Sequence, residues 1–277
     1  MRDYLISVVI PSLGGDLTET LDSIFTSRIS QPIEVIICLP NISHTVKNIS
    51  NYRKLRIIYS EQYGQVYQRI VGFRESKGEY VLQLDDDILL NKDCLRRLVS
   101  TLEILPKNSC ISPCLFDIDG SPMYGQKKSG ILSVYYRLIN GKLGYQPGGI
   151  SRAGTNFGVN PTETTEELLQ VDWQPGGCVL HRKENLVLID YYPNKGKAYC
   201  EDLIHSFLLR KSGVSLFIDT NAKCHTPLNP RLSIQGLMAD YSARRYFVKL
   251  ANLSIVRMWL HYVVYVVISL KLKLFLK

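Results

Sequence analysis

Short apolar runs alternate with segments of helical periodicity along the first hundred residues, and this alternation most constrains the fold. The apolar runs, rich in β-branched residues, are residues 5–10, 33–39, 55–59 and 80–84. Apolar residues at helical spacing follow the first, third and fourth runs, at residues 17–27, 66–76 and 92–104. This pattern predicts an α/β fold, Rossmann-like, with helices covering both faces of a mostly parallel sheet. Such folds bind ligands beyond the carboxyl ends of their strands.

The second half of the chain continues this pattern less regularly. Residues 117–167 are rich in Gly, Pro, Asn and Thr, which predicts an insertion made mainly of loops. Strand and helix patterns return afterwards, at residues 178–181, 201–212 and 214–218. We therefore expect an α/β body over residues 1–230 and an amphipathic helical tail over residues 231–277.

The net charge of +8 comes almost entirely from that tail. Residues 241–277 contain seven Lys or Arg residues and no acid, whereas residues 1–240 hold 26 bases and 25 acids. Nucleic-acid binding depends on clustered Lys and Arg, and no such stripe precedes residue 241. The charge distribution therefore argues against a nucleic-acid partner for the body.

The tail contains 13 mostly apolar residues between Arg257 and Lys271, including Trp259, Tyr262 and Tyr265. A helix that spans a bilayer needs about 20 apolar residues, so this run is too short. Amphipathic aromatic rings and flanking cations favour a helix that lies on an anionic membrane surface. The alternative is an ordinary C-terminal core helix or an oligomer contact.

The cysteines and the N-terminus bear on location. Seven cysteines lack the paired spacing of a zinc site or a disulfide framework, which indicates reduced, mostly buried thiols. The apolar run after Met1 is too short for the core of a signal peptide. We expect a cytoplasmic protein, held peripherally on the inner face of the cell membrane by its tail.

Three carboxylates, Asp85, Asp86 and Asp87, directly follow the apolar run at residues 80–84. Like charges this close raise one another's pKa unless a cation neutralises them. Oxygen ligands suit Mg²⁺ or Mn²⁺, and either ion can also bind a substrate diphosphate. The triplet therefore predicts a metal site, with an acidic turn before the next helix as the alternative.

A second acidic pair, Glu201 and Asp202, opens the helix predicted at residues 201–212. Acids in a first turn are also favoured by the helix dipole alone, which needs no catalytic role. In a cleft, one of these carboxylates could serve as a general base, although the helix N-terminus would lower its pKa.

Two single residues are weaker candidates. His225 follows the last predicted strand and could complete the coordination of a metal, although a lone His is more often a surface or core residue. Trp173 precedes the pair Gly176 and Gly177, and a sugar ring could stack on its indole, which could equally belong to the core.

Taken together, these positions resemble the family 2 glycosyltransferases, which have the GT-A fold. The resemblance covers residues 5–226, and it is carried by residues 7–11, 68–72, 77–80, 84–87, 176–177, 201–202 and 209–213. It implies an inverting enzyme that moves a sugar from a nucleoside-diphosphate sugar, UDP- or dTDP-linked, to an acceptor hydroxyl. The implied acceptor is a lipid-linked oligosaccharide or a polysaccharide, as in cell-envelope synthesis, and the implied cofactor is Mn²⁺ or Mg²⁺.

The resemblance also implies roles for individual residues. Asp202 would be the catalytic base. The implied metal ligands are Asp87, Asp85 and His225. The implied donor-binding residues are Pro11, Ser12, Arg69, Asp85 and Asp86. Glu201 would be the second catalytic residue and support the acceptor. The candidate acceptor-binding residues are Gly176 and Gly177, together with Trp173 from the stacking argument above.

One departure from the family concerns the nucleotide. The family usually carries an acid after the second strand, but residues 38–41 here contain none. Glu61, Gln62 and Gln65 follow the third strand and are candidates to replace it. The missing acid leaves open a non-catalytic carbohydrate-binding or scaffold protein that keeps the fold. A nucleotidyltransferase would need a basic phosphate loop after the first strand, and residues 11–16 contain no Lys or Arg.

Overall fold

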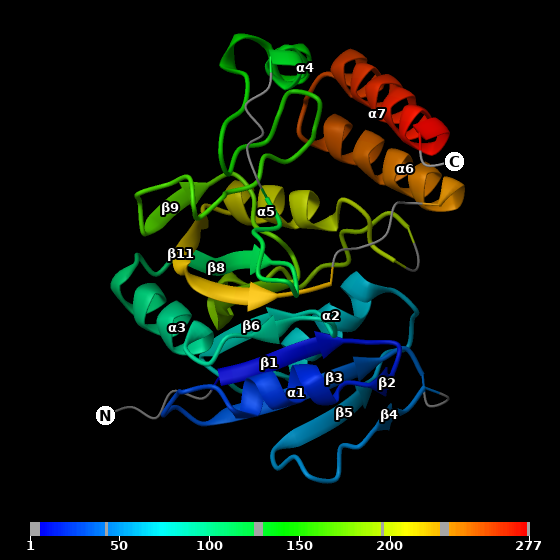
Figure 1. Cartoon of the computed structure of the whole chain (residues 1–277). Coiled ribbons are helices and arrows are strands. Elements are labelled where there is room, and N and C mark those ends of the chain that lie inside the picture. The colour runs from blue at the N-terminus through cyan, green and yellow to red at the C-terminus, as the bar shows by residue number, and fades with distance from the viewer. Residues whose placement is uncertain (1–5, 42–43, 125–129, 195–196, 228–232, 276–277) are drawn as a thin grey trace.

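A nine-stranded mixed sheet forms the centre of the protein (Figure 1). The computed structural model describes residues 6–41, 44–124, 130–194, 197–227 and 233–275. Within them the strand order is β5-β3-β1-β6-β10-β8-β11-β7, and β9 pairs with β11. These strands are β1 Ile6–Pro11, β3 Ile33–Leu39, β5 Leu55–Tyr59, β6 Tyr80–Leu84, β7 Leu89–Leu90, β8 Ser109–Phe116, β9 Leu168–Val171, β10 Cys178–Arg182 and β11 Ser215–His225. A second, two-stranded sheet pairs β2 Gly15–Asp16 with β4 Val46–Lys47.

The helices confirm the α/β prediction and add one element. They are α1 Thr18–Phe25, α2 Gln65–Glu75, α3 Cys94–Ile104, α4 Gly130–Asn140, α5 Glu201–Lys211, α6 Ile234–Leu250 and α7 Ile255–Phe275. Two 3₁₀ turns, Gly141–Leu143 and Lys183–Asn185, also occur. Helix α4 lies inside the stretch predicted to consist mainly of loops, because the turn-forming residues on both sides of it obscured its apolar spacing.

The sheet is parallel in its first half and mixed in its second. Strands β5, β3, β1 and β6 are parallel neighbours, as predicted. Strand β10 runs antiparallel to both β6 and β8, while β11 is parallel to β8 and antiparallel to β7 and β9. The carboxyl ends of the parallel strands still share one edge, where a ligand site is expected.

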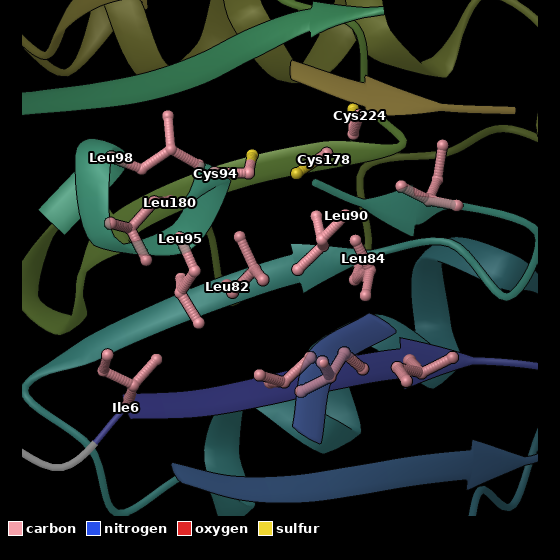
Figure 2. Packing of buried hydrophobic residues seen from close by; sticks show 14 of the residues in the cluster. Ile6, Leu82, Leu84, Leu90, Cys94, Leu95, Leu98, Cys178, Leu180 and Cys224 are labelled. Carbon is pink, nitrogen blue, oxygen red and sulfur yellow. The ribbon is translucent and has the colours of Figure 1, made fainter. Parts of the chain in front are cut away.

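Successive residues of the strands face opposite layers of helices. Val8 and Ile10 of β1 pack in the cluster that includes residues of α1 and α3, whereas Val9 packs with Phe73 of α2. Figure 2 shows the α3 side of this core, where the buried thiols of Cys94, Cys178 and Cys224 lie among leucines. None of the seven cysteines, all of which are described, is in a disulfide bond, and six are buried, as the prediction of mostly buried thiols expects.

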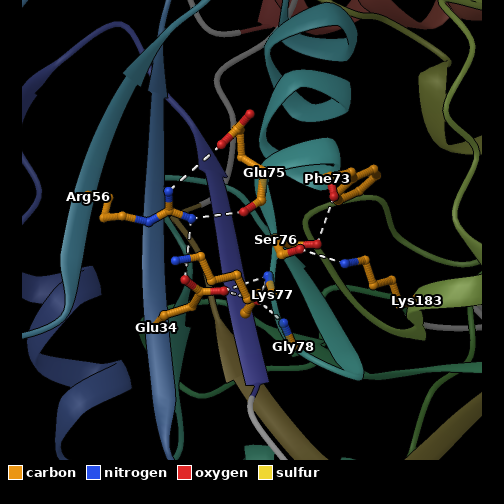
Figure 3. Close-up of polar contacts among 9 residues, drawn as sticks. Glu34, Arg56, Phe73, Glu75, Ser76, Lys77, Gly78 and Lys183 are labelled. Atoms are coloured by element: carbon orange, nitrogen blue, oxygen red, sulfur yellow. Dashed lines mark hydrogen bonds and ion pairs between the residues drawn. The ribbon is translucent and has the colours of Figure 1, made fainter.

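A polar network joins the amino ends of the parallel strands, at the edge of the sheet opposite the expected ligand site (Figure 3). The buried carboxylate of Glu34 on β3 accepts hydrogen bonds from Ser7 Oγ at 2.5 Å and from the backbone N–H of Lys77 at 2.7 Å. Arg56 pairs with the second oxygen of Glu34 at 3.3 Å. These contacts hold the amino ends of β1, β3 and β6 together, so residues 77–80 of the family pattern serve the fold and not the cavity.

The two C-terminal helices lie beside α4 at the end of the molecule away from β5 (Figure 1). Helix α6 packs on the body, because Phe247 is fully buried in a cluster with Trp173, Leu203 and Ile204. In α7, Met258 is fully buried, and Tyr262 donates a hydrogen bond to Asp240 of α6. No helix in the described part of the chain is both long and apolar enough to cross a bilayer.

Candidate active site

A cavity of about 440 Å³ opens at the carboxyl ends of the central strands. Its walls come from the loops after β1 and β6, the segment before β10, and the starts of α2 and α5. The polar side chains that line it are Ser12, Tyr63, Gln65, Gln68, Asp85, Asp86, Asp87, Tyr124, Lys197, Asp202 and Thr226. Four carboxylates and one lysine among these described residues make the cavity acidic, which favours a bound cation.

The three acids after β6 have three different environments. The backbone N–H of Asp85 donates to the carbonyl of Gly177 at 2.8 Å, which fixes the start of the loop against the glycine pair. Ser12 Oγ donates to Asp86 Oδ2 at 2.5 Å, so the predicted donor residue Ser12 holds the middle acid. Pro11 lines the cavity beside Ser12, as the resemblance implies. The loop after β1 therefore supports the acid triplet directly.

The carboxylate of Asp85 is held by two donors. Its Oδ1 atom accepts hydrogen bonds from Arg69 Nη2 at 3.0 Å and from Gln65 Nε2 at 3.2 Å. Burial raises the pKa of Asp85 to about 6, and the positive charge of Arg69 opposes that rise. Only the Oδ2 atom of Asp85 is left without a hydrogen bond within the described chain, so one oxygen remains for a ligand.

Asp87 is the most exposed acid of the triplet and the least constrained. Its carboxylate has no hydrogen bond or ion pair with another side chain in the described residues. Partial burial, together with the neighbouring charge of Asp86, raises its pKa. A bound cation would relieve both effects, so Asp87 has the character of a metal ligand.

Arg69 does not lie where the resemblance implies. Its side chain is 2 % exposed, and it does not line the cavity. The guanidinium instead bridges two acids, donating to Asp85 at 3.0 Å and to Glu201 Oε1 at 2.7 Å. The expectation of direct donor contact is therefore wrong, since Arg69 acts from behind the cavity by neutralising carboxylates of both acidic motifs.

Asp202 faces the cavity from the first turn of α5. Cys200, the residue just before α5, has a left-handed backbone with φ of 59°, a strained conformation of the kind that concentrates at functional sites. Asp202 Oδ1 accepts a hydrogen bond from the backbone N–H of Leu203 at 3.0 Å. Burial, reinforced by the charge of Glu201, nevertheless raises the pKa of Asp202 to about 7.

The expectation that the helix start would lower this pKa is wrong, because desolvation outweighs the single N–H bond. A carboxylate with a pKa near the working pH is suited to general base catalysis. Its position on the cavity wall and its raised pKa distinguish Asp202 from an acid that only stabilises the start of a helix.

Glu201 is turned away from the cavity, although it is the chain neighbour of Asp202. It is 4 % exposed and is bound by Arg69 and by the hydroxyl of Tyr191, which donates to Glu201 Oε1. Glu201 therefore lies behind the cavity wall and does not itself line the cavity. Glu201 instead anchors the start of α5 to the group that also holds Asp85.

The glycine pair lets the backbone pass between the two acidic motifs. A Cβ atom on Gly176 would lie 2.8 Å from Glu201 Oε2, and one on Gly177 would lie 3.1 Å from Ile88 and 3.4 Å from Asp85 Oδ2. Any side chain at Gly176 would push the Glu201 carboxylate aside. Both glycines line the cavity. Because they have no side chains, Asp85 and Asp202 can both line the same cavity on either side of them.

The aromatic residues that line the cavity are Tyr63 and Tyr124, and not Trp173. Trp173 is 1 % exposed, and its Nε1 donates to the carbonyl of Phe157 at 2.8 Å. Its indole therefore has no open face for a sugar, and the predicted stacking is wrong. Trp173 meets Tyr124 edge to face at 5.6 Å, so it supports the ring that lines the wall.

His225 does not join the acids at the cavity. Its imidazole packs 5.8 Å from the ring of Phe116, while the adjacent Thr226 lines the cavity. Among the described residues, no group of three or more His, Cys, Asp or Glu side chains is arranged to hold a metal ion. The implied set of Asp85, Asp87 and His225 is therefore not assembled, and the residues that fit a cation are the two acids.

Several cavity residues have no sequence signal of their own. Tyr63, Tyr124 and Lys197 line the cavity from loops, and Tyr191 acts behind it. Of the three candidates to replace the missing acid, Gln65 lines the cavity whereas Glu61 and Gln62 do not. Gln65 could be found from the sequence because it follows the third predicted strand and therefore lies at the same edge of the sheet.

Solved structures with the same fold are glycosyltransferases of low sequence identity. GalNAc-T7 with UDP, GalNAc and Mn²⁺ gives a TM-score of 0.58 at 16% identity, over 82% of this chain and 45% of that one. TarS 1-349 from S. aureus with UDP-GlcNAc gives 0.53 at 15% identity, over 91% and 69%. The mannosyltransferase PcManGT from Pyrobaculum calidifontis, with GDP-Man and Mn²⁺, gives 0.51 at 14% identity, over 86% and 63%. The chain spans less than half the length of GalNAc-T7 and of the longer TarS chain, at 45% and 41%.

The fold, with acids at the carboxyl ends of its parallel strands, is that of the GT-A glycosyltransferases. The sequence also matches the model of Glycosyl transferase family 2 over residues 7–156, which is more than half of the chain. The chain therefore belongs to glycosyl transferase family 2. The matched region includes the acid triplet and ends before Asp202. A comparison with curated proteins found no match.

Proposed function

We propose that this chain is an inverting glycosyltransferase that transfers a sugar from a nucleoside-diphosphate sugar to an acceptor hydroxyl. The observation that carries the proposal is that Asp85, Asp87 and Asp202 line one cavity, although they come from motifs more than 100 residues apart. The two motifs have separate tasks. The acid triplet is suited to bind a metal ion together with the diphosphate of the donor, and Asp202, with its raised pKa, is suited to accept a proton as the general base.

The donor diphosphate binds at the triplet. Asp87 and the free Oδ2 atom of Asp85 are the residues that would hold Mn²⁺ or Mg²⁺, with the remaining ligands supplied by phosphate and water oxygens. When bound, the ion stabilises negative charge on the leaving diphosphate. The Mn²⁺ in the GalNAc-T7 and PcManGT structures supports this assignment.

The acceptor reacts from the side of Asp202. Its hydroxyl oxygen forms a bond to C1 of the donor sugar as the bond from C1 to the diphosphate oxygen breaks, and the nucleoside diphosphate leaves with that electron pair. Asp202 takes the proton of the hydroxyl. A single displacement of this kind inverts the configuration at C1.

The donor nucleotide is proposed to be UDP or dTDP. Tyr63 and Gln65 line the cavity from the segment after β5 and supply the polar contacts that an acid after β3 would otherwise provide. The UDP-GlcNAc bound in TarS supports a uridine donor, whereas PcManGT holds GDP-Man. A panel of UDP-, dTDP- and GDP-sugars in a thermal-shift assay with Mn²⁺ distinguishes these donors. If no sugar nucleotide binds, the result favours the non-catalytic carbohydrate-binding alternative.

Replacing Asp87 by Ala tests the metal assignment. We expect the variant to lose Mn²⁺-dependent binding of the sugar nucleotide identified in the panel, by about tenfold or more, which is about 1.4 kcal/mol. Isothermal titration with and without Mn²⁺ measures this difference. Asp119→Ala is a matched control, because Asp119 is an exposed acid that does not line the cavity. An unchanged Mn²⁺ response in Asp87→Ala would reject Asp87 as a ligand.

We also propose that residues 231–277 place the catalytic body, residues 1–230, on the inner face of the cell membrane, near a lipid-linked oligosaccharide or polysaccharide acceptor in envelope synthesis. Helix α7 presents an exposed stripe made of Val256, Trp259, Val263 and Val267, which recur at helical spacing. Tyr262 does not belong to the stripe, because its hydroxyl binds Asp240. The stripe and the cationic tail support binding to an anionic lipid surface.

The double variant Trp259→Ser with Val263→Ser tests this placement. We expect it to bind vesicles that contain phosphatidylglycerol at least about tenfold more weakly, since each apolar side chain contributes about 1.5–3 kcal/mol when buried. Co-sedimentation with these vesicles and with neutral phosphatidylcholine vesicles measures the effect. Ile104→Ser is the control, because Ile104 is an exposed apolar residue on α3. These point variants are preferable to deleting residues 255–277, which would also remove the buried Met258. Equal binding by variant and wild type would exclude the stripe as the membrane contact.

A further inference from the structure

A second cavity, of about 310 Å³, adjoins the first, and the proposed reaction does not use it. Met123 and Tyr124 line both cavities, so the second cavity lies directly beside the one that Asp202 faces. The other walls are α4, the loop at residues 145–158, and two residues of α6 and α7. Its volume is at the lower end of the range of small-molecule sites, about 300–1,000 Å³.

The second cavity is walled by aromatic rings that remain partly exposed. Tyr136 of α4 lies 5.0 Å from Tyr145 and 5.8 Å from Phe157, and Tyr135 lies 5.6 Å from Tyr136. Phe157 is buried beneath the tyrosines, which are only half-buried. Rings fixed by their neighbours in this way present rigid apolar faces at little cost in conformational entropy.

The charged groups of this cavity are already paired or neutral. Arg244 donates to Asp240 at 3.0 Å and to the carbonyl of Gly154 at 2.7 Å. His261 contacts the hydroxyl of Tyr135 at 2.6 Å, and burial lowers its pKa to about 4, so it is uncharged at neutral pH. No free charge faces the cavity from the described residues, which disfavours a phosphate or an acidic ligand.

Three polar groups of the cavity remain available among the described residues: the amide of Asn156 and the hydroxyls of Tyr124 and Tyr136. Asn156 lines the cavity, and its amide has no hydrogen bond with any described residue. An amide both donates and accepts, which matches a sugar hydroxyl. Apolar ring faces beside a free amide and free phenol hydroxyls are complementary to a neutral sugar ring, whose C–H faces are apolar and whose edges carry hydroxyls.

We propose that the second cavity binds a neutral sugar of the acceptor, next to the sugar that carries the attacking hydroxyl. Tyr136 and Tyr145 stack on that sugar, and Asn156 binds its hydroxyls. The acceptor is therefore a saccharide chain of at least two residues. This inference rests on the proposed transferase function, because that function places the reacting hydroxyl at Asp202.

The test measures binding of neutral oligosaccharides to the full chain with UDP and Mn²⁺. The probes are glucose to maltotetraose and N-acetylglucosamine to chitotetraose, together with galacturonic acid oligomers of the same lengths, followed by saturation-transfer NMR and isothermal titration. We expect chains of two or more neutral sugars to bind at least tenfold more tightly than the single sugars. Asn156→Ala should remove most of that advantage without changing the thermal unfolding temperature, because the side chain has no partner to lose.

Tyr136→Ala and Tyr136→Phe separate stacking from hydrogen bonding, since Phe keeps the ring. Binding of the neutral chains should fall about tenfold in Ala and stay near the wild-type value in Phe. The proposal is overturned if no neutral chain binds the wild type, if only the acidic chains bind, or if Asn156→Ala keeps the full length preference. Hydrolysis of the sugar nucleotides, measured in parallel, distinguishes the two proposals. If the protein binds oligosaccharides but turns over no sugar nucleotide, the result contradicts the proposed transferase function and leaves the proposed sugar-binding site standing.

Discussion

Replacing Asp202 by Asn is expected to remove sugar transfer while leaving donor binding largely intact. Asn has nearly the same shape and cannot accept the proton of the acceptor hydroxyl. General base catalysis contributes about 10²–10⁴-fold, so kcat for transfer should fall by that factor. Binding of the sugar nucleotide with Mn²⁺ should change little, because Asp85 and Asp87 provide the metal contacts. Release of nucleoside diphosphate and isothermal titration, on the same samples, give the two readouts.

The pH dependence of the wild type tests the same role. Burial raises the pKa of Asp202 to about 7, and only the deprotonated form can take a proton. The value of kcat/KM for the acceptor should therefore fall about tenfold for each pH unit below about 7 and level off above it. In Asp202→Asn, this fall of kcat/KM below about pH 7 should disappear. Glu184→Gln changes an acid remote from the cavity and should retain both rate and profile. Transfer by Asp202→Asn at the wild-type rate would exclude Asp202 as the base.

Replacing Arg69 by Met is expected to cause the largest loss of stability. The Arg69 side chain is 2 % exposed and pairs with Glu201, which is 5 % exposed, and with Asp85, which is 25 % exposed. Without the guanidinium, both carboxylates lose their compensating charge. Removing one partner of a buried ion pair typically costs about 3–5 kcal/mol, and we expect the free energy of unfolding to fall by that amount. Denaturation by guanidinium chloride, followed by circular dichroism, measures the loss.

Three further variants make the Arg69 prediction specific. Arg69→Lys should recover only part of the loss, because one ammonium group cannot reproduce the forked geometry that reaches both acids. Arg69→Met combined with Glu201→Gln should be more stable than Arg69→Met alone, since the uncompensated charge is gone. Arg28→Met removes an exposed pair with Asp93 and should change stability by no more than about 0.5 kcal/mol. An unchanged unfolding midpoint in Arg69→Met would contradict the buried bridge.

The structure shows how one arginine connects the two acidic motifs. Arg69 Nη1 contacts Glu201 and Nη2 contacts Asp85, so the loop after β6 and the start of α5 share one cation. Glu201 is thereby held inside the protein, and Asp202, the next residue, is left to face the cavity. A change at Arg69 should therefore affect both the donor and the acceptor side of the site.

The central elements were predictable from the sequence because their signals are local. The apolar runs at β1, β3, β5 and β6 and the helical spacing of α2 depend only on neighbouring residues. Helix α4 was missed, since its flanking residues favour turns. The antiparallel course of β10 was also missed, because strand direction depends on the path of a distant insertion.

The fold class and the two acidic motifs, Asp85 to Asp87 and Glu201 with Asp202, could be recognised from the sequence alone. An acid triplet after an apolar run and an acidic pair before a helix are patterns that a single chain displays. The glycine pair at Gly176 and Gly177 was recognised in the same way.

The surroundings of each of these residues depend on the tertiary structure. Burial and charge depend on groups brought from distant parts of the chain, as with Arg69, which lies 132 residues from Glu201. Arg69 holds Glu201 inside the protein, while desolvation raises the pKa of Asp202. Contacts with Phe157 and Tyr124 place Trp173 behind the cavity wall. Electrostatic and packing environments arise from folding in three dimensions, so adjacent residues of similar chemistry acquire different roles.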